Sequence, residues 1–167
     1  HLSIRRQRQM CIREGLLSLG ITPQLVSRTA KKDVLTYEDL TPEIMSEYTV
    51  IINTTPLGMY PHTATCPPIP YEQLTNKHLV YDLIYNPDQT LFMEKASKQG
   101  AVTKNGLEML LLQAFAHGTF GIDKQKLNIL QLFVGRLLYQ QNLLRIDRTN
   151  DNVIISYTND EYVSGFR

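Results

Sequence analysis

Two short runs of aliphatic and β-branched residues constrain the fold of this chain more than any other feature. Tyr48–Thr54 (Tyr-Thr-Val-Ile-Ile-Asn-Thr) and Leu79–Ile84 each contain three apolar or aromatic residues in a row, Val50–Ile52 and Leu79–Tyr81, so both sides of each strand would be largely apolar. Strands that are buried on both faces occur almost only in parallel sheets with helices packed on both sides. The two runs therefore predict an α/β protein.

Helix-like segments alternate with strand-like ones across the central hundred residues. Thr90–Gln99 carries Leu91, Met93 and Ala96 and stops at Gly100, which is typical of an amphipathic helix with a C-terminal glycine. The same criteria predict a helix that ends at 16–19, a short helix within 37–47, and strands within 22–27 and 101–104. This alternation predicts a Rossmann-like, doubly wound parallel sheet.

The composition is that of a globular protein, with 43% hydrophobic residues and a formal net charge of +1. It gives no reason to expect nucleic acid or a membrane as partner. The longest apolar run, Met109–Leu112, is far shorter than the roughly 20 residues of a spanning helix, and no signal-peptide pattern opens the chain, so we expect a cytoplasmic protein. Cys11 and Cys66 have no redox or metal-binding spacing, so neither a disulfide framework nor a metal site is expected. The oligomeric state is left open.

Composition also divides the chain into three parts. Residues 1–14 hold four arginines and one acid, and we interpret them as a solvated basic arm because no aromatic residue interleaves the arginines. Residues 15–114 contain all eight prolines and the alternating elements. Residues 115–167 form an unassigned tail, expected to be mostly helical or disordered. The predicted sheet is incomplete, because the first strand and phosphate loop of such a domain are missing from the sequence before residue 15.

The residues after each predicted strand are the candidates for chemistry, because ligands of doubly wound sheets bind at the carboxyl ends of the strands. The first strand is followed by Ser27-Arg28-Thr29-Ala30-Lys31-Lys32, where a domain that prefers NAD places an acidic residue on the ribose 2′-hydroxyl. A guanidinium can instead pair with a 2′-phosphate, which favours NADP. The alternative interpretation is a basic surface turn.

Three further phrases complete a pattern: Ile51–Pro61, Val80–Pro87 and Asn105–Ala114. In this order and spacing they resemble the nucleotide-binding domain of the shikimate dehydrogenase family. Ser27-Arg28-Thr29 with Lys32 is similar to that family's Asn-Arg-Thr-x-x-Arg/Lys motif, with Ser in place of Asn. The resemblance covers residues 15–114 and implies a Rossmann-like NADP-binding domain.

The resemblance also implies roles for individual residues. The 2′-phosphate end of NADP would be bound by Ser27, Arg28, Thr29 and Lys32. The nicotinamide would be lined by Leu83 and Gly106, and the hydroxyls and carboxylate of shikimate would be bound by Tyr85 and Gln113. The implied reaction is the reversible NADP-dependent reduction of 3-dehydroshikimate to shikimate, a step toward aromatic amino acids.

No catalytic residue is assigned. In the family the proton relay is a Lys and Asp pair on a separate substrate-binding domain before the nucleotide domain, and we expect this chain to lack it and to be inactive alone. Asp82 is expected to hold the Tyr85 loop in place and not to act as an acid or base. The alternatives are a non-catalytic nucleotide-binding fragment and a related dehydrogenase that acts on quinate or uses NAD.

Both flanks depart from the family pattern. The glycine-rich phosphate loop expected before Gly15 is replaced by Arg5-Arg6-Gln7-Arg8-Gln9-Met10, whose long side chains keep the backbone away from a pyrophosphate. One hypothesis is that residues 1–14 and 115–167 are out-of-frame translations, since codons exist whose shifted frames resemble the family's phosphate loop and its tryptophan-bearing end. The other is a genuine tail with an amphipathic helix along Leu127, Leu130, Val134 and Leu137. The nucleotide sequence decides between them.

Overall fold

The computed structural model describes residues 12–110 and 153–156. Residues 12–18 are helical and a further helix begins at residue 107. The other elements, in chain order, are β1 (Gln24–Ser27), β2 (Val34–Thr36), the 3-10 turn η1 (Tyr37–Asp39), α2 (Pro42–Glu47), β3 (Val50–Asn53), the 3-10 turn η2 (Tyr71–Gln73), β4 (Leu79–Asp82), α3 (Leu91–Lys98), β5 (Val102–Lys104) and β6 (Val153–Ser156).

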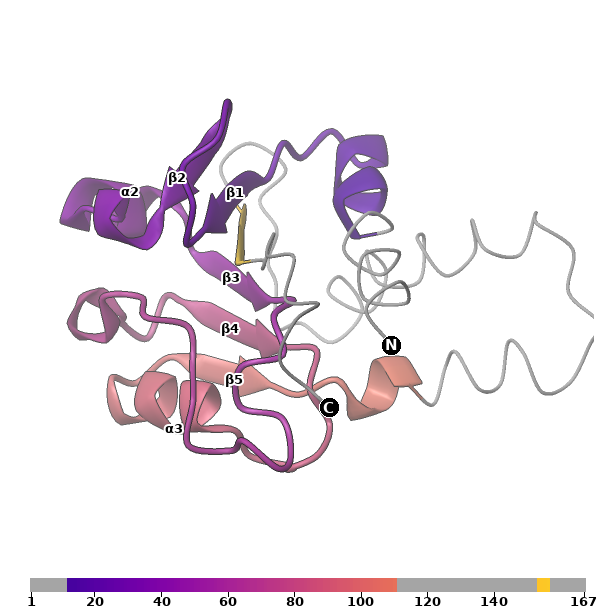
Figure 1. Cartoon of the computed structure of the whole chain (residues 1–167). Helices are drawn as coiled ribbons and strands as arrows, with labels where there is room; N and C mark the ends of the chain where they lie inside the picture. The colour runs from indigo at the N-terminus through magenta and orange to yellow at the C-terminus, as the bar shows by residue number, and fades with distance from the viewer. Residues whose placement is uncertain (1–11, 111–152, 157–167) are drawn as a thin grey trace, which may run out of the picture.

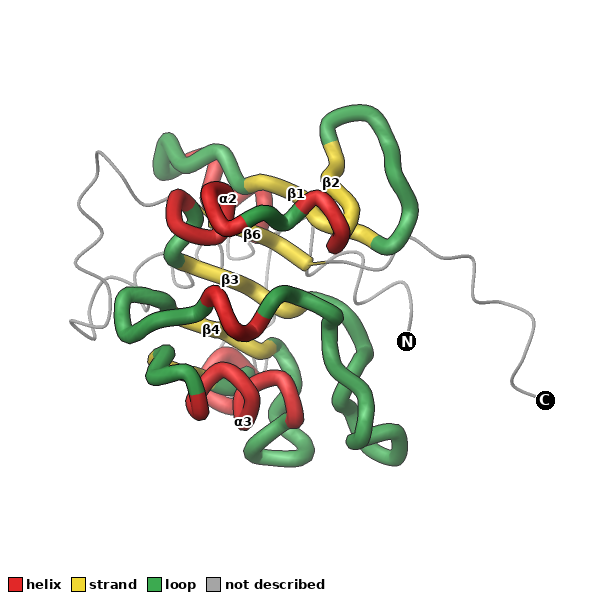
Figure 2. Tube along the Cα trace, turned by 90° about the vertical axis from the view of Figure 1, so that its left-hand side faces the viewer, coloured by secondary structure: helices red, strands yellow, loops and turns green. Residues whose placement is uncertain are grey.

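The strands form one parallel sheet in the order β2-β1-β6-β3-β4-β5 (Figures 1 and 2). The predicted doubly wound α/β class is confirmed. Its central strand, β6, comes from the far end of the chain and pairs with β1 on one side and β3 on the other. β3 and β6 have nearly the same sequence, Val-Ile-Ile-Asn and Val-Ile-Ile-Ser, and lie in register from Val50 opposite Val153 to Asn53 opposite Ser156.

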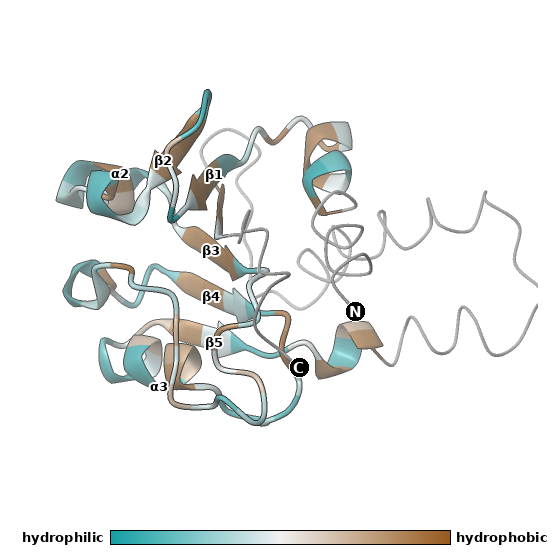
Figure 3. Cartoon of the chain, viewed as in Figure 1, coloured by the Kyte–Doolittle hydropathy of each residue, from teal (hydrophilic) through white to brown (hydrophobic). Residues whose placement is uncertain are grey.

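Helices cover both faces of this sheet, which explains why its central strands are apolar on both sides. One face packs against residues 12–18 and the helix that begins at 107, through a core that includes Ile12, Leu16, Ile52, Met109 and Ile155. The other face packs against α2 and α3, with Met45, Ile51, Val80, Phe92 and Ile154 in its core. Figure 1 places α2 and α3 on the opposite side of the sheet from residues 12–18, and Figure 3 shows the strands between them as predominantly hydrophobic.

Local signals account for the ends of the helices. Thr90 precedes α3, and its Oγ1 accepts a hydrogen bond from the Met93 amide at 3.3 Å. Gly100 follows α3 with φ +85°, a conformation that glycine adopts without the strain of a Cβ, so the chain turns sharply into β5. Thr41 and Pro42 begin α2 in the same way, with Thr41 Oγ1 accepting from the Ile44 amide at 3.5 Å.

Two strands were not expected from the sequence. β2 is only three residues long and follows β1 after six residues, 28–33, whereas parallel strands usually need a connection of about a dozen residues or more. The short connection suffices because both strands are short. β6 lies in the tail that was expected to be mostly helical or disordered.

The rest of the tail, and residues 1–11, lie outside the described residues. The hypotheses for residues 1–14 and 115–167 therefore stay hypotheses. Among the residues that the structure describes, no helix has the length and apolar character needed to cross a membrane.

Candidate functional site

A buried polar network holds the loops at the carboxyl ends of β3 and β4. Asp82, which is 0% exposed, accepts hydrogen bonds on Oδ1 from Asn53 Nδ2 and from the Ile84 amide, both at 3.0 Å. Its Oδ2 accepts from Thr90 Oγ1 at 2.7 Å. The carboxylate thus fixes β3, the start of α3 and the loop that leads to Tyr85. This agrees with the positioning role expected for Asp82.

Asn53 extends the same network into the loop after β3. Its Oδ1 accepts from the Thr55 amide at 2.9 Å and from Thr55 Oγ1 at 2.7 Å, while Thr55 Oγ1 accepts from the Leu57 amide at 3.2 Å. Side chains thereby satisfy backbone groups that the tight turn leaves unpaired. Asn53 and Thr55 thus hold the loop after β3 in its tight conformation.

Burial raises the pKa of Asp82 above its ordinary value of 3.8, although the hydrogen bonds from Thr90, the Ile84 amide and Asn53 oppose this shift. A carboxyl with a raised pKa in the folded state binds more protons when folded than when unfolded. The free energy of unfolding that it contributes therefore falls as pH rises from 3.8 through the raised pKa, and is constant above it.

We therefore expect the stability difference between the native chain and Asp82→Asn to depend on pH. The native chain should lose stability relative to the variant as pH rises from about 4 to 7. Urea unfolding of both chains across this range measures the difference, and it cancels the exposed carboxyls Asp39, Glu43 and Glu94, whose pKa values are lowered by hydrogen bonds. If the native chain instead gained stability relative to Asp82→Asn as pH rises, the raised pKa of Asp82 would be contradicted.

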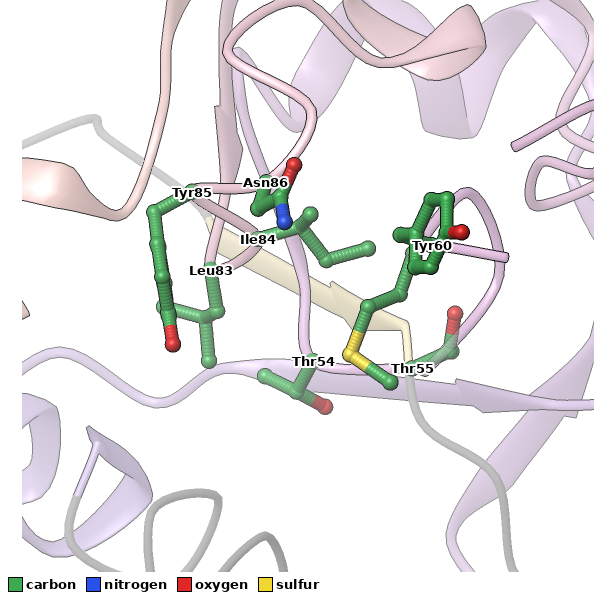
Figure 4. Close-up of a pocket in the computed structure, with 8 residues that line it drawn as sticks. Thr54, Thr55, Tyr60, Leu83, Ile84, Tyr85 and Asn86 are labelled. Carbon is green, nitrogen blue, oxygen red and sulfur yellow. The ribbon is translucent and has the colours of Figure 1, made fainter. Parts of the chain in front are cut away.

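A pocket of about 190 Å³ lies beside this network, at the carboxyl ends of β3 and β4 (Figure 4). Buried side chains form its floor: Thr54, Thr55, Leu83 and Ile84. Its rim is formed by Met59, Tyr60, Tyr85 and Asn86, and Tyr60 and Tyr85 are 68% and 46% exposed. Figure 4 shows the two tyrosines on opposite sides of the pocket. The volume suits one ring-sized group and not a whole dinucleotide.

Gly106 packs against the back of this pocket. A Cβ at this position would lie 2.2 Å from the carbonyl oxygen of Leu83 and 2.6 Å from its carbonyl carbon, and the Gly106 amide donates to the Ile84 carbonyl at 3.0 Å. The structure therefore brings Leu83 and Gly106 together, the two residues that the resemblance places against nicotinamide. The protein's own packing also requires a glycine at position 106, because two backbone segments approach each other closely there.

A second cavity, of about 330 Å³, lies beyond the carboxyl ends of β1 and β2. It is lined by Arg28, Thr36, Tyr37, Glu38 and Pro68. Tyr37 is 9% exposed, burial raises the pKa of its hydroxyl, and that hydroxyl is hydrogen-bonded to Ser156 Oγ at 2.5 Å. Arg28 thus contributes a cation to a cavity that already has a rigid aromatic wall.

The other predicted residues are placed as follows. Ser27 is buried beneath the turn, where its Oγ accepts from the Thr29 amide at a long 3.4 Å, while Thr29 and Lys32 are exposed and do not line the cavity of Arg28. Tyr85 stands at the rim of the smaller pocket. Gln113 lies outside the described residues.

Sequence reasoning missed most of the residues that line these pockets, among them Tyr37 and Tyr60, and it missed Ser156, which is hydrogen-bonded to Tyr37. A signal existed for the first, since Thr36 and Asp39 form a capping box in which the Thr36 amide and Oγ1 both donate to Asp39 Oδ2 at 2.7 Å. That box places Tyr37 in the first turn of η1, directly after β2. No local signal links Ser156 to this edge.

A doubly wound parallel sheet with pockets beyond the carboxyl ends of its strands defines the Rossmann-like class of α/β domains. Sequence similarity makes the class more specific. The chain is 41% identical over 97 residues to the shikimate dehydrogenase (NADP+) of Methanococcus vannielii, a match that covers 58% of this chain and 34% of that protein. It is 49% identical over 69 residues to the shikimate dehydrogenase (NADP+) of Desulforamulus reducens, covering 41% and 24%.

The central part of the chain is therefore similar in sequence to shikimate dehydrogenases, in agreement with the resemblance of its motifs. The chain spans about a third of the length of the curated relatives it matches. No family model matches the chain.

Two solved structures are similar to parts of the chain. A chorismate mutase/shikimate 5-dehydrogenase fusion protein from Clostridium acetobutylicum is 30% identical, with a TM-score of 0.43 and coverage of 65% of this chain and 40% of that one. A shikimate dehydrogenase in complex with NADP+ is 23% identical, with a TM-score of 0.48 and coverage of 77% and 60%.

Proposed function

We propose that this chain provides the NADP-binding part of a shikimate dehydrogenase, an oxidoreductase that reversibly reduces 3-dehydroshikimate to shikimate. The observation that carries the proposal is Arg28, which follows β1 within the family's motif and lines the 330 Å³ cavity with Tyr37. The curated relatives that the chain matches in this region are NADP+ enzymes by name. The activity belongs to the whole enzyme, of which these residues correspond to about a third.

The described residues fit the two ends of NADP. The guanidinium of Arg28 suits the 2′-phosphate, and the wall formed by Tyr37 and Pro68 suits the adenine. The nicotinamide would lie at the pocket of Thr54, Leu83 and Ile84, with Tyr85 on the rim toward the substrate. The described residues include no glycine-rich loop for the pyrophosphate between these ends.

The residues of the smaller pocket would orient the reacting groups. NADPH supplies the hydride when bound. The Gly106 and Leu83 backbones hold the back of the pocket, and Asp82 fixes Leu83–Asn86 through the Ile84 amide. The Tyr85 hydroxyl would donate to or accept from a substrate hydroxyl at the rim. The described residues thus bind and orient, and we assign no proton transfer to them.

The test of the proposed function is the replacement Arg28→Ala. Removing the guanidinium should weaken NADPH binding about 10- to 100-fold, because a charge-assisted pair with the 2′-phosphate is lost, and should leave NADH binding within about twofold. Fluorescence titration with each nucleotide measures both affinities.

A matched control is Lys77→Ala. It makes the same change in net charge at an exposed position just before β4, at the amino ends of the strands and away from both pockets, and should alter neither affinity. Equal losses for NADPH and NADH in Arg28→Ala would remove Arg28 from the 2′-phosphate site, and a native chain that binds neither nucleotide would refute the proposed function.

A further inference from the structure

β6 connects the two halves of the sheet. Among the described residues, β1 pairs with β2 and β6, and β3 pairs with β4 and β6, so every strand pairing between the two halves of the sheet runs through Val153–Ser156. Without this segment the sheet would consist of two separate pieces, β2-β1 and β3-β4-β5. Each piece would expose a strand edge whose amides and carbonyls have no partner, and such an edge is a template for an added strand.

The side chains of β6 complete both cores. Val153 and Ile155 point into the core beneath residues 12–18, and Ile154 points into the core beneath α2 and α3. All three are 3% exposed or less. The slot between β1 and β3 is therefore specific for a short segment that is apolar on both faces, which is the pattern of Val153-Ile154-Ile155.

Ser156 ties the carboxyl end of β6 to both halves. From the β2 side, the Tyr37 hydroxyl is bonded to Ser156 Oγ at 2.5 Å. From the β3 side, the Thr54 amide and Thr54 Oγ1 both donate to the Ser156 carbonyl, at 3.0 and 2.7 Å. Tyr37 lines the cavity of Arg28 and Thr54 lines the smaller pocket, so one residue connects the two pockets.

We propose that residues 153–156 dock into the sheet by strand addition and set the distance between the two nucleotide pockets, with Ser156 as the positioning residue. The strand contributes no reactive group. It connects the half of the sheet that carries Arg28 to the half that carries Leu83. The affinity for a dinucleotide that spans both pockets depends on this connection through β6, whereas the affinity for a ligand that fills one pocket does not. The second part of this proposal rests on the proposed function.

Strand docking is tested in the full chain by Ile154→Asn and its control Val102→Asn. Ile154 is fully buried at the centre of the sheet, while Val102 is 39% exposed on the edge strand β5. If β6 connects the two halves of the sheet, Ile154→Asn lowers Tm by about 10 °C or more, and Val102→Asn lowers it by less than about 3 °C. Hydrogen exchange of the native chain should show the amides of 153–156 as protected as those of β3. Equal Tm values for the two variants, or rapid exchange at 153–156, would overturn the docking.

Positioning is tested by Ser156→Ala, with Ser97→Ala on the exposed face of α3 as control. The expected result is a loss of about 5- to 20-fold in NADP+ affinity, with adenosine 2′,5′-bisphosphate affinity within about twofold of the native value. Equal losses for both ligands, or no loss, would overturn the positioning role. A native chain that binds neither ligand would overturn the proposed function instead, and strand docking would then be decided by the melting temperatures and exchange alone.

Discussion

Replacing Gly106 with Ala should destabilise the protein by about 3 kcal/mol or more and lower Tm by about 10 °C or more. The new Cβ would lie 2.2 Å from the Leu83 carbonyl oxygen and 2.6 Å from the carbonyl carbon, and a backbone cannot yield as the end of a flexible side chain can. Either the start of the helix at residue 107 or the loop after β4 must move. Thermal unfolding followed by circular dichroism measures the loss.

Gly20→Ala is the matched control. Its Cβ would meet nothing within 4 Å, but the residue has φ +79°, so its expected cost is only the backbone strain of about 1 kcal/mol. A Gly106→Ala variant that is no less stable than Gly20→Ala would show that the close approach to Leu83 is absent.

The change at Gly106 should also reach the smaller pocket. Leu83 and Ile84 form its floor, and the Gly106 amide is bonded to the Ile84 carbonyl. At a temperature where the variant is still folded, nucleotide affinity should therefore fall as well. Normal affinity in a destabilised variant would separate Gly106 from the pocket.

Asp82→Ala is expected to cost about 3–5 kcal/mol of unfolding free energy. The replacement leaves three buried donors without their acceptor, namely Asn53 Nδ2, the Ile84 amide and Thr90 Oγ1. Each unsatisfied buried donor costs about 1–3 kcal/mol, and the loops partly relax. Urea denaturation gives the difference in free energy.

Asp82→Asn distinguishes hydrogen bonding from charge at the same position. The amide oxygen can still accept from the Ile84 amide, and the Thr90 hydroxyl can accept from the new NH2 group, so the expected loss is about 1 kcal/mol near neutral pH. If Asp82→Asn were as damaging as Asp82→Ala, the negative charge and not the hydrogen-bond network would hold these loops.

Much of the fold could be predicted because its signals are local. The apolar runs at Tyr48–Thr54 and Leu79–Ile84 correspond to β3 and β4, and the stop at Gly100 ends α3 as expected. The family motifs stand in the expected order in the sequence. They therefore identified four candidate binding residues, namely Arg28, Leu83, Tyr85 and Gly106. The contact between Gly106 and the Leu83 backbone could not be predicted from the sequence, since their separation in space depends on how the helix at 107 packs against β4.

The sequence by itself determined strands β1, β3, β4 and β5, helix α3 and the α/β class, because capping, β-branching and apolar periodicity act over a few residues. Only the tertiary structure decided that Val153–Ser156 is the central strand and that Ser156 joins Tyr37 to Thr54. Val50-Ile51-Ile52 and Val153-Ile154-Ile155 carry the same local signal. Their places in the sheet are set by which strand edges and cores they complete, and these partners lie far away in the chain.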